Sequence, residues 1–198
     1  MRVRFFDRMM RGFDAKGFAD WRRRLVGDLE GEVVELGTGT GLNFGYYPTG
    51  AHVLASDRDP MMLSLARVRA PKVDATVSLT AADAMRLPFE DASADAVVIS
   101  LMLCSVPDQA LALQEVRRVL KPGGRFRFVE HVRDVDGSRN ARFQDRWNPV
   151  YKRFSGGCNW NRRTFEAVEA AGFRVAELTR FREGPKPTAP HVIAEATL

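Results

Sequence analysis

Residues 33–43 read Val-Val-Glu-Leu-Gly-Thr-Gly-Thr-Gly-Leu-Asn and are the most informative stretch of the chain. Its first four residues predict a short buried strand, which is followed by glycines at alternate positions, Gly37, Gly39 and Gly41. Glycine adopts positive φ without a Cβ penalty, so the chain can turn sharply here and a ligand can lie against its backbone. A helix that begins near Asn43 would direct unpaired N–H groups toward the same ligand. We therefore expect a nucleotide-like molecule to bind at the carboxyl edge of this strand.

The composition indicates one ordinary globular domain, because 45% of the 198 residues are hydrophobic and 28% are charged. No run approaches the roughly 20 apolar residues of a membrane span, and the Arg-rich N-terminus lacks the continuous apolar segment of a secretory signal. The two cysteines, Cys104 and Cys158, lie far apart, without the spacing of a metal site. We therefore expect a reducing cytoplasmic setting and no bound metal.

The net charge of +5 fits either a mildly basic enzyme or attraction to an anionic partner. The sequence has neither zinc-finger spacing nor an RNA-recognition aromatic motif, so we expect no nucleic-acid partner. Residues 1–30 mix aromatic and Arg residues and predict helices, one of them capped by Asp20. These helices either pack on the core or form a lid over a hydrophobic acceptor. Such a lid can also touch lipid headgroups, which would place a cytoplasmic protein at the inner face of a membrane. The sequence leaves the oligomeric state open.

Strands alternate with helices along most of the chain. The expected strands are 32–36, 51–56, 75–79, 94–101, 125–131, 173–178 and 191–197. Pro60 opens one intervening helix at its first turn, and Asp108 caps another over 109–120, with Leu111 among its core positions. No helix separates the last two strands, which favours an antiparallel pair at one edge. The pattern predicts an open, mostly parallel α/β sheet with helices on both faces.

The glycine spacing bears on which nucleotide binds. The dinucleotide fingerprint G-x-G-x-x-G needs its third glycine three positions after the second, where it lets the helix approach the strand. Here that position is Leu42, and Gly41 comes one residue too early. A ligand without a pyrophosphate does not need that packing. The spacing therefore weighs against a nicotinamide-dependent oxidoreductase. That class remains the alternative enzyme, and a non-catalytic cofactor-binding protein is a further alternative.

Acidic residues follow the first three strands. Asp57 ends the second strand, where a carboxylate can accept both hydroxyls of a ribose. Asp83 and the backbone of Ala84 follow the third strand and can recognise an adenine edge, while Glu35 ends the first strand. Three acidic groups favour a cationic ligand that carries ribose and adenine, and S-adenosylmethionine fits that description.

At these residues the chain resembles the class I S-adenosylmethionine-dependent methyltransferases, with a type 11 methyltransferase domain spanning residues 1–198. The motifs that carry the resemblance are 35–41, Ser56-Asp57, 82–84 with 87–89, 95–100 and 115–124. The family implies a Rossmann-like, seven-stranded sheet with an antiparallel last strand, S-adenosylmethionine as cofactor and S-adenosylhomocysteine as product. The cofactor contacts that it implies are Glu35, Gly37, Thr38, Gly39, Asn43, Asp57, Arg58, Asp83, Ala84 and Leu101.

Four further segments are similar to the methyltransferase-like subgroup that includes thiol S-methyltransferases. They are 43–50, 103–106, 130–132 and 157–159. This likeness implies methyl transfer to a small lipophilic acceptor, with a thiol favoured. A phospholipid headgroup amine and a quinone-type ring remain alternative acceptors.

The acceptor side is expected where the fourth and fifth strands end. His131 is the candidate general base, because a thiol must lose its proton before it attacks; the alternative is a histidine satisfied by backbone at a strand end. Cys104 is expected to line the pocket wall rather than to act as a nucleophile. Residues 133–160 are expected to form an acceptor-pocket insertion, and the alternative is ordinary helix packing. The candidate contacts in it are Trp147, Tyr151, Cys158 and Asn159.

Overall fold

A single sheet organises the chain, for which the computed structural model describes residues 2–198. The strand order is β3-β2-β1-β4-β5-β7-β6. The strands are β1 (Gly31–Leu36), β2 (Ala51–Asp57), β3 (Thr76–Ala81), β4 (Ala94–Ser100), β5 (Leu120–His131), β6 (Arg174–Arg182) and β7 (Pro190–Thr197). The first five strands in this order pair in parallel, whereas β7 is antiparallel to both β5 and β6. The predicted seven-stranded sheet with an antiparallel last strand is confirmed.

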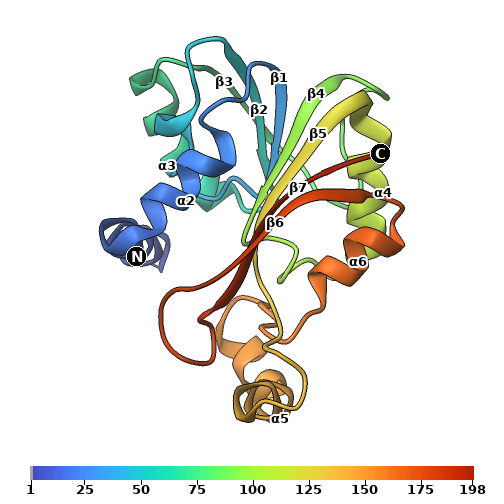
Figure 1. The fold of residues 1–198 in the computed structure, drawn as a ribbon. Coiled ribbons are helices and arrows are strands. Elements are labelled where there is room, and N and C mark those ends of the chain that lie inside the picture. The colour runs from blue at the N-terminus through green and yellow to red at the C-terminus, as the bar shows by residue number, and fades with distance from the viewer. Residues whose placement is uncertain (1) are drawn as a thin grey trace.

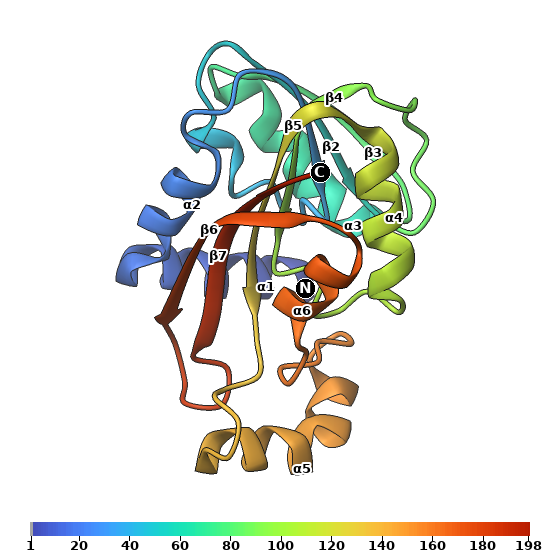
Figure 2. The same cartoon turned by 45° about the vertical axis from the view of Figure 1, so that its right-hand side comes forward.

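Helices cover both faces of the sheet (Figure 1). The α-helices are α1 (Arg2–Phe13), α2 (Ala19–Val26), α3 (Pro60–Arg69), α4 (Gln109–Val119), α5 (Arg139–Phe154) and α6 (Thr164–Ala170). Short helical turns are η1 (Asp14–Phe18), η2 (Phe44–Tyr46) and η3 (Ala70–Lys72). Helices α2 and α3 lie on one face, and α4 and α6 on the other. Helix α5 stands beyond the end of β5, away from the sheet (Figure 2).

The central strands are buried on both faces, as the continuous apolar run in β4 predicts. Val97 and Ile99 belong to the core cluster that includes α4 and α6. Ala96 and Val98 alternate with them and pack in the cluster that includes α2 and α3. The sheet is therefore a rigid middle layer, and its edges carry the loops that are free to bind ligands.

The register brings the ends of the parallel strands together at one edge. Leu36 pairs with Ser56, Asp57 with Ala81, and Ser100 with Val129. The loops that follow β1, β2, β3, β4 and β5 therefore start side by side. Open α/β sheets bind their ligands at this carboxyl edge.

Several local predictions need correction. Asp20 does not cap a helix: it lies inside α2, where it accepts a hydrogen bond from Arg23. Leu111 is exposed rather than part of the core, because α4 turns Ala112 and Leu113 toward the sheet. Strand β5 begins at Leu120, before the predicted residue 125, because Leu120 already pairs with Ala94 across an irregularity in the ladder. The caps at Pro60 and Asp108 are confirmed.

Candidate cofactor and acceptor site

The glycine loop after β1 leaves one open position on its surface. All three glycines have positive φ, which is 66° at Gly37, 57° at Gly39 and 78° at Gly41. A Cβ at Gly37 would lie 2.5 Å from Cγ of Met102, and one at Gly41 would lie 2.4 Å from the ring of Phe44. A Cβ at Gly39 would meet no atom within 4 Å. The space over Gly39 is therefore a cradle that the protein itself does not fill, as a backbone-bound cofactor requires.

Asp57 closes this cradle at the end of β2. Its Oδ2 accepts a hydrogen bond from the Gly39 N–H at 2.8 Å, and its Oδ1 accepts one from the Asp59 N–H at 2.8 Å. Each carboxylate oxygen has two lone pairs, so both oxygens can still accept from a ribose diol. Burial raises the pKa of Asp57, and the two N–H donors and Arg58 partly offset this rise. The residues present fit a cofactor with a ribose.

Glu35 is fully enclosed beneath the glycine loop. Its carboxylate accepts hydrogen bonds from three side chains at 2.8–3.1 Å: Thr38 Oγ1, Asn43 Nδ2 and Tyr47 Oη. Burial raises the pKa of Glu35, against the effect of these donors. Its oxygens therefore hold the loop in shape, and direct contact of Glu35, Thr38 or Asn43 with the cofactor stays a prediction.

The N-terminal helices fasten onto the same loop. Arg22 of α2 donates to Asn43 Oδ1 at 2.6 Å and to Asp14 at 2.8 Å, so the Glu35 network extends into the N-terminal segment. From α1, Asp7 accepts a hydrogen bond from Thr40 Oγ1 at 2.6 Å and pairs with Arg69 of α3 at 2.8 Å. Helix α1 is thus tied to the glycine loop and to α3 at once.

The remaining predicted cofactor residues lie along the same edge of the sheet. Arg58 is exposed next to Asp57. Asp83 and Ala84 form the turn after β3, where Asp83 Oδ1 accepts from the Met85 N–H at 2.9 Å. Leu101 follows β4 with a positive φ of 55°, which is strained for a residue with a side chain. The strain lies where the loop after β4 turns back toward Gly37 through Met102.

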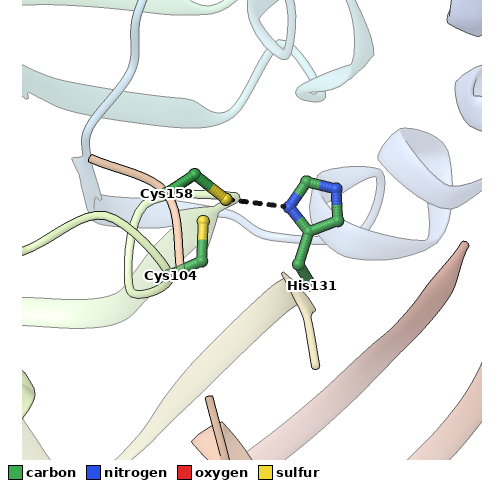
Figure 3. Close-up of side chains that lie close together, drawn as sticks. All are labelled: Cys104, His131 and Cys158. Carbon is green, nitrogen blue, oxygen red and sulfur yellow. Dashed lines mark hydrogen bonds between the residues drawn. The ribbon is translucent and has the colours of Figure 1, made fainter. Parts of the chain in front are cut away.

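Three polar side chains on the acceptor side converge from separate elements (Figure 3). Cys104 comes from the loop after β4, His131 ends β5, and Cys158 lies between α5 and α6. The Cys158 Sγ lies 3.6 Å from the His131 Nδ1. The nearest donor atoms of all three lie within 4.8 Å of one another. Both cysteines are buried and form no disulfide.

The protonation of this group follows from its neighbours. A hydrogen bond toward Cys158 raises the pKa of Cys104, and the same bond lowers the pKa of Cys158. Burial lowers the pKa of His131, but Cys104 and Glu130 more than offset this and raise it above its ordinary value. Beside it, burial lowers the pKa of His191 to about 3, and His191 Nδ1 lies 2.8 Å from the Ala189 carbonyl oxygen. His191 is therefore neutral.

Only some of the predicted residues in segment 133–160 lie close to the group of Cys104, His131 and Cys158. Asn159 donates to the Cys104 carbonyl oxygen from its N–H at 2.7 Å and from Nδ2 at 3.2 Å. Tyr151 stacks on Trp160 at a centroid distance of 3.8 Å, and burial raises the pKa of Tyr151 to about 12. Trp147 points along the outer face of α5, with 45% of its surface exposed. The structure therefore groups all the predicted acceptor residues except Trp147.

Some residues that shape the site escaped the sequence analysis. Glu130 faces the loop after β4 and accepts hydrogen bonds from the N–H groups of Met102, Leu103 and Cys104 at 2.6–3.0 Å. The sequence signal for a buried role of Glu130 is a single acidic residue at the end of a largely apolar strand segment. Asp7 carried no comparable signal, because its partners lie far away in the sequence.

The cofactor half matches a known family. The family model described as a methyltransferase domain matches residues 34–128. Thiol S-methyltransferase TMT1B of Homo sapiens is 37% identical over 171 residues, which cover 83% of this chain and 69% of that protein. Demethylmenaquinone methyltransferase of Thermus thermophilus is 41% identical over 118 residues, covering 56% of this chain and 53% of that protein.

Solved structures share the fold. A crystal structure of a methyltransferase from Bacillus halodurans C-125 superposes with a TM-score of 0.74 and 20% identity. The match covers 91% of this chain and 98% of that one. At that identity the likeness concerns the fold alone. The sequence relatives, in contrast, favour methyl transfer over nicotinamide chemistry.

Proposed function

Since the chain belongs to the class I S-adenosylmethionine-dependent methyltransferases, we propose that it methylates the sulfur of a small lipophilic thiol. S-adenosylmethionine is the cofactor and S-adenosylhomocysteine the product. When bound, the cofactor supplies an electrophilic methyl group on a sulfonium sulfur. What the protein adds is alignment of the acceptor, exclusion of water and control of one proton.

The observation that carries the thiol acceptor is the group formed by Cys104, His131 and Cys158. A free thiol has a pKa of about 8.5 and attacks as a thiolate. The site must therefore remove the thiol proton or stabilise the thiolate. His131 Nδ1 faces this group, 3.6 Å from the Cys158 Sγ, which places an imidazole where it could accept the proton of an acceptor thiol. The likeness to thiol S-methyltransferases supports the same acceptor.

The other acceptors have less support. The quinone-methylating relative matches 56% of this chain, against 83% for the human thiol S-methyltransferase. For a phospholipid amine, no acidic side chain of the group would meet the cationic headgroup, because Glu130 is enclosed behind the loop after β4. A thiol is therefore the first choice and a quinol the second.

We assign two segments to the acceptor within the single domain of residues 1–198. Residues 1–30 act as a lid, because α1 reaches across the glycine loop through Asp7 and Thr40. Residues 133–160 supply one side of the acceptor pocket through Tyr151, Cys158 and Asn159. Water exclusion by such a lid protects a thiolate from reprotonation.

Exposed apolar side chains on helices α1 and α5 support a peripheral membrane contact. Among residues 2–198, no helix has both the length and the apolar character needed to cross a bilayer. Helix α5 instead exposes Phe143, Trp147, Val150 and Phe154 at positions i, i+4, i+7 and i+11, which form one stripe. On α1, Phe5 is 72% exposed between Arg4 and Arg8. Apolar stripes flanked by basic residues bind the interface of anionic bilayers.

A methyl-transfer screen tests the acceptor. The purified chain is incubated with radiolabelled S-adenosylmethionine and an alkyl thiol, the corresponding alcohol, a quinol or phosphatidylethanolamine. We expect label in the thioether alone. Label in the quinol or the lipid, with none in any thiol, would contradict the thiol assignment.

Liposome co-sedimentation tests the membrane contact. The double variant Phe5→Ser, Phe154→Ser should lose binding to anionic vesicles. The control is Leu111→Ser on α4, which removes an exposed apolar side chain from another surface and should bind like the parent. Equal binding by all three proteins would exclude these helices as the membrane surface.

A further inference from the structure

The three converging side chains on the acceptor side are all metal ligands by type. Two thiols and an imidazole face one another, and each comes from a different loop or strand end (Figure 3). The Ser105 Oγ borders this group, 3.4 Å from the Cys104 Sγ. Among residues 2–198, this is the one set of three His, Cys, Asp or Glu residues whose donor atoms converge in this way. Thiolate and imidazole are the donors that zinc prefers.

The spacing also suits one shared ion. Zinc bonds of about 2.3 Å to sulfur and 2.0–2.1 Å to nitrogen at tetrahedral angles place a sulfur and a nitrogen ligand about 3.6 Å apart, and two sulfurs about 3.8 Å apart. The Cys158 Sγ and the His131 Nδ1 are 3.6 Å apart. The Cys104 Sγ lies within 4.8 Å of the donor atoms of Cys158 and His131. A shift of about 1 Å or less in the Cys104 side chain would therefore bring all three donors to zinc-binding distances.

We propose that Cys104, His131 and Cys158 bind one zinc-type divalent ion whose fourth position takes the sulfur of the acceptor. This inference rests on the proposed thiol acceptor and makes it more specific. Structural zinc sites use four protein ligands, whereas catalytic sites use three and keep one position open. Here the described chain supplies three.

The surrounding hydrogen bonds hold two of the ligands in place before any ion binds. Asn159 ties the Cys158 loop to the Cys104 carbonyl through two hydrogen bonds. Glu130 accepts from the Cys104 N–H at 3.0 Å on the other side. Gly157, next to Cys158, has a φ of 98°, a backbone conformation that glycine adopts without the strain of a side chain. Supporting contacts of this kind orient metal ligands.

Coordination of the acceptor sulfur to the ion would account for the loss of the thiol proton. The acceptor sulfur bonds to the ion, its S–H bond breaks, and the proton leaves to solvent. A lone pair of the coordinated sulfur then forms the new bond to the methyl carbon. The old carbon–sulfur bond breaks and leaves its electron pair on the departing thioether. His131 serves in this scheme as a ligand through Nδ1 rather than as the base. The neutral methylated product is a weaker ligand than a thiolate and dissociates.

Cobalt substitution tests the site directly. The full chain is stripped with a chelator, kept reduced with a phosphine, and titrated with Co²⁺. We expect one Co²⁺ per chain, with thiolate charge-transfer absorption and tetrahedral visible bands that Zn²⁺ abolishes. The chain has only two cysteines, so the absorption reports this site without any variant.

Variants locate the ligands. Cys104→Ser, Cys158→Ser and His131→Gln should each weaken Co²⁺ binding by more than the roughly 10–100-fold that loss of a supporting residue costs. His52→Gln is the matched control, because His52 is exposed and pairs with Glu32 far from the group. If a ligand variant unfolds, protection of both thiols of the parent chain from alkylation by Zn²⁺ gives the same information. Absence of stoichiometric binding, absence of the thiolate band, or lack of thiol protection would overturn the site.

Thiol binding at the fourth coordination position is tested separately with the cobalt protein. Addition of 2-mercaptoethanol to the Co²⁺ protein should strengthen the thiolate band, whereas ethylene glycol should leave it unchanged. An unchanged spectrum with the thiol would overturn the inference. Equal thiol methylation by metal-free and Zn²⁺-loaded protein would also overturn it and leave the thiol acceptor standing. A normal cobalt spectrum in a protein that methylates no thiol would instead overturn the proposed acceptor and, with it, the role of the open position.

Discussion

Replacement of Asp57 by asparagine isolates its contribution to cofactor binding. The carboxylate holds the Gly39 and Asp59 N–H groups at 2.8 Å each, and it has two further lone pairs for the ribose diol. In Asp57→Asn one oxygen becomes an NH₂ donor, so at least one charge-assisted bond to the ribose is lost. Such bonds contribute about 1.5–3 kcal/mol, which corresponds to a roughly 10–150-fold rise in Kd.

Calorimetric titration with S-adenosylhomocysteine measures this change. The control is Asp59→Asn, which removes the same charge two residues away. It keeps the helix cap, because asparagine caps as well as aspartate and the Asp59 side chain accepts from the Met61 N–H. We expect the control to bind like the parent. If folded Asp57→Asn protein binds with the parent's affinity, the ribose does not lie at Asp57 and the reasoning fails.

Three other substitutions separate the cofactor loop, the lid and the acceptor side. Gly39→Ala should cost about 1–2 kcal/mol of stability through its positive φ alone, since the added Cβ meets no protein atom, yet it should abolish measurable S-adenosylhomocysteine binding; retained affinity would place the cofactor elsewhere. In Asp7→Asn, helix α1 loses its ion pair with Arg69, and chemical denaturation should show a loss of about 1–2 kcal/mol of stability at pH 7. Burial raises the pKa of Asp7, but Arg69 and Thr40 lower it overall, so this stability is present above the ordinary Asp pKa and is lost as the pH falls through the lowered value. The denaturation midpoints of parent and variant should therefore converge in acid, and a constant difference would contradict the ion pair. Glu130→Gln should lower thiol methylation while S-adenosylhomocysteine affinity stays near that of the parent, because the Glu130 carboxylate holds the loop of Cys104 and not the glycine loop; a matched loss of both would show that the two sides are coupled.

The sequence predicted the fold because its signals are local. The glycines after β1, Pro60 at the start of α3 and Asp108 at the cap of α4 each act on neighbouring backbone. Strand pairing then followed from apolar runs separated by helices. The position of β7 between β5 and β6 had no such signal, because it depends on which edge the final hairpin covers.

The acceptor side was harder to predict, because its residues meet only after folding. Cys104 and Cys158 lie on either side of β5 in the sequence, and no short-range spacing marks them as partners of His131. The sequence prediction of no bound metal rested on that spacing. Residue type alone suggests a pocket position for Trp147, but the helix periodicity turns it to the outer face of α5 with Phe143. The composition of residues 133–160 indicates a pocket segment. Which of its residues face the pocket depends on the orientation of α5 about its own axis.

Two buried carboxylates explain how one sheet edge holds two binding regions. Glu35 ends β1 and holds the side chains of the loop that follows it, and Glu130 of β5 holds the backbone of the loop that follows β4. Both carboxylates are almost fully buried, with 1% of Glu35 and 0% of Glu130 exposed. Burying a carboxylate costs several kcal/mol unless donors surround it, and each of these has three. The loops of a methyl donor and of its acceptor must keep a fixed separation during transfer. Met102 packs against Gly37 and joins the two loops, so we expect the two acids to fix the separation of the methyl donor from its acceptor.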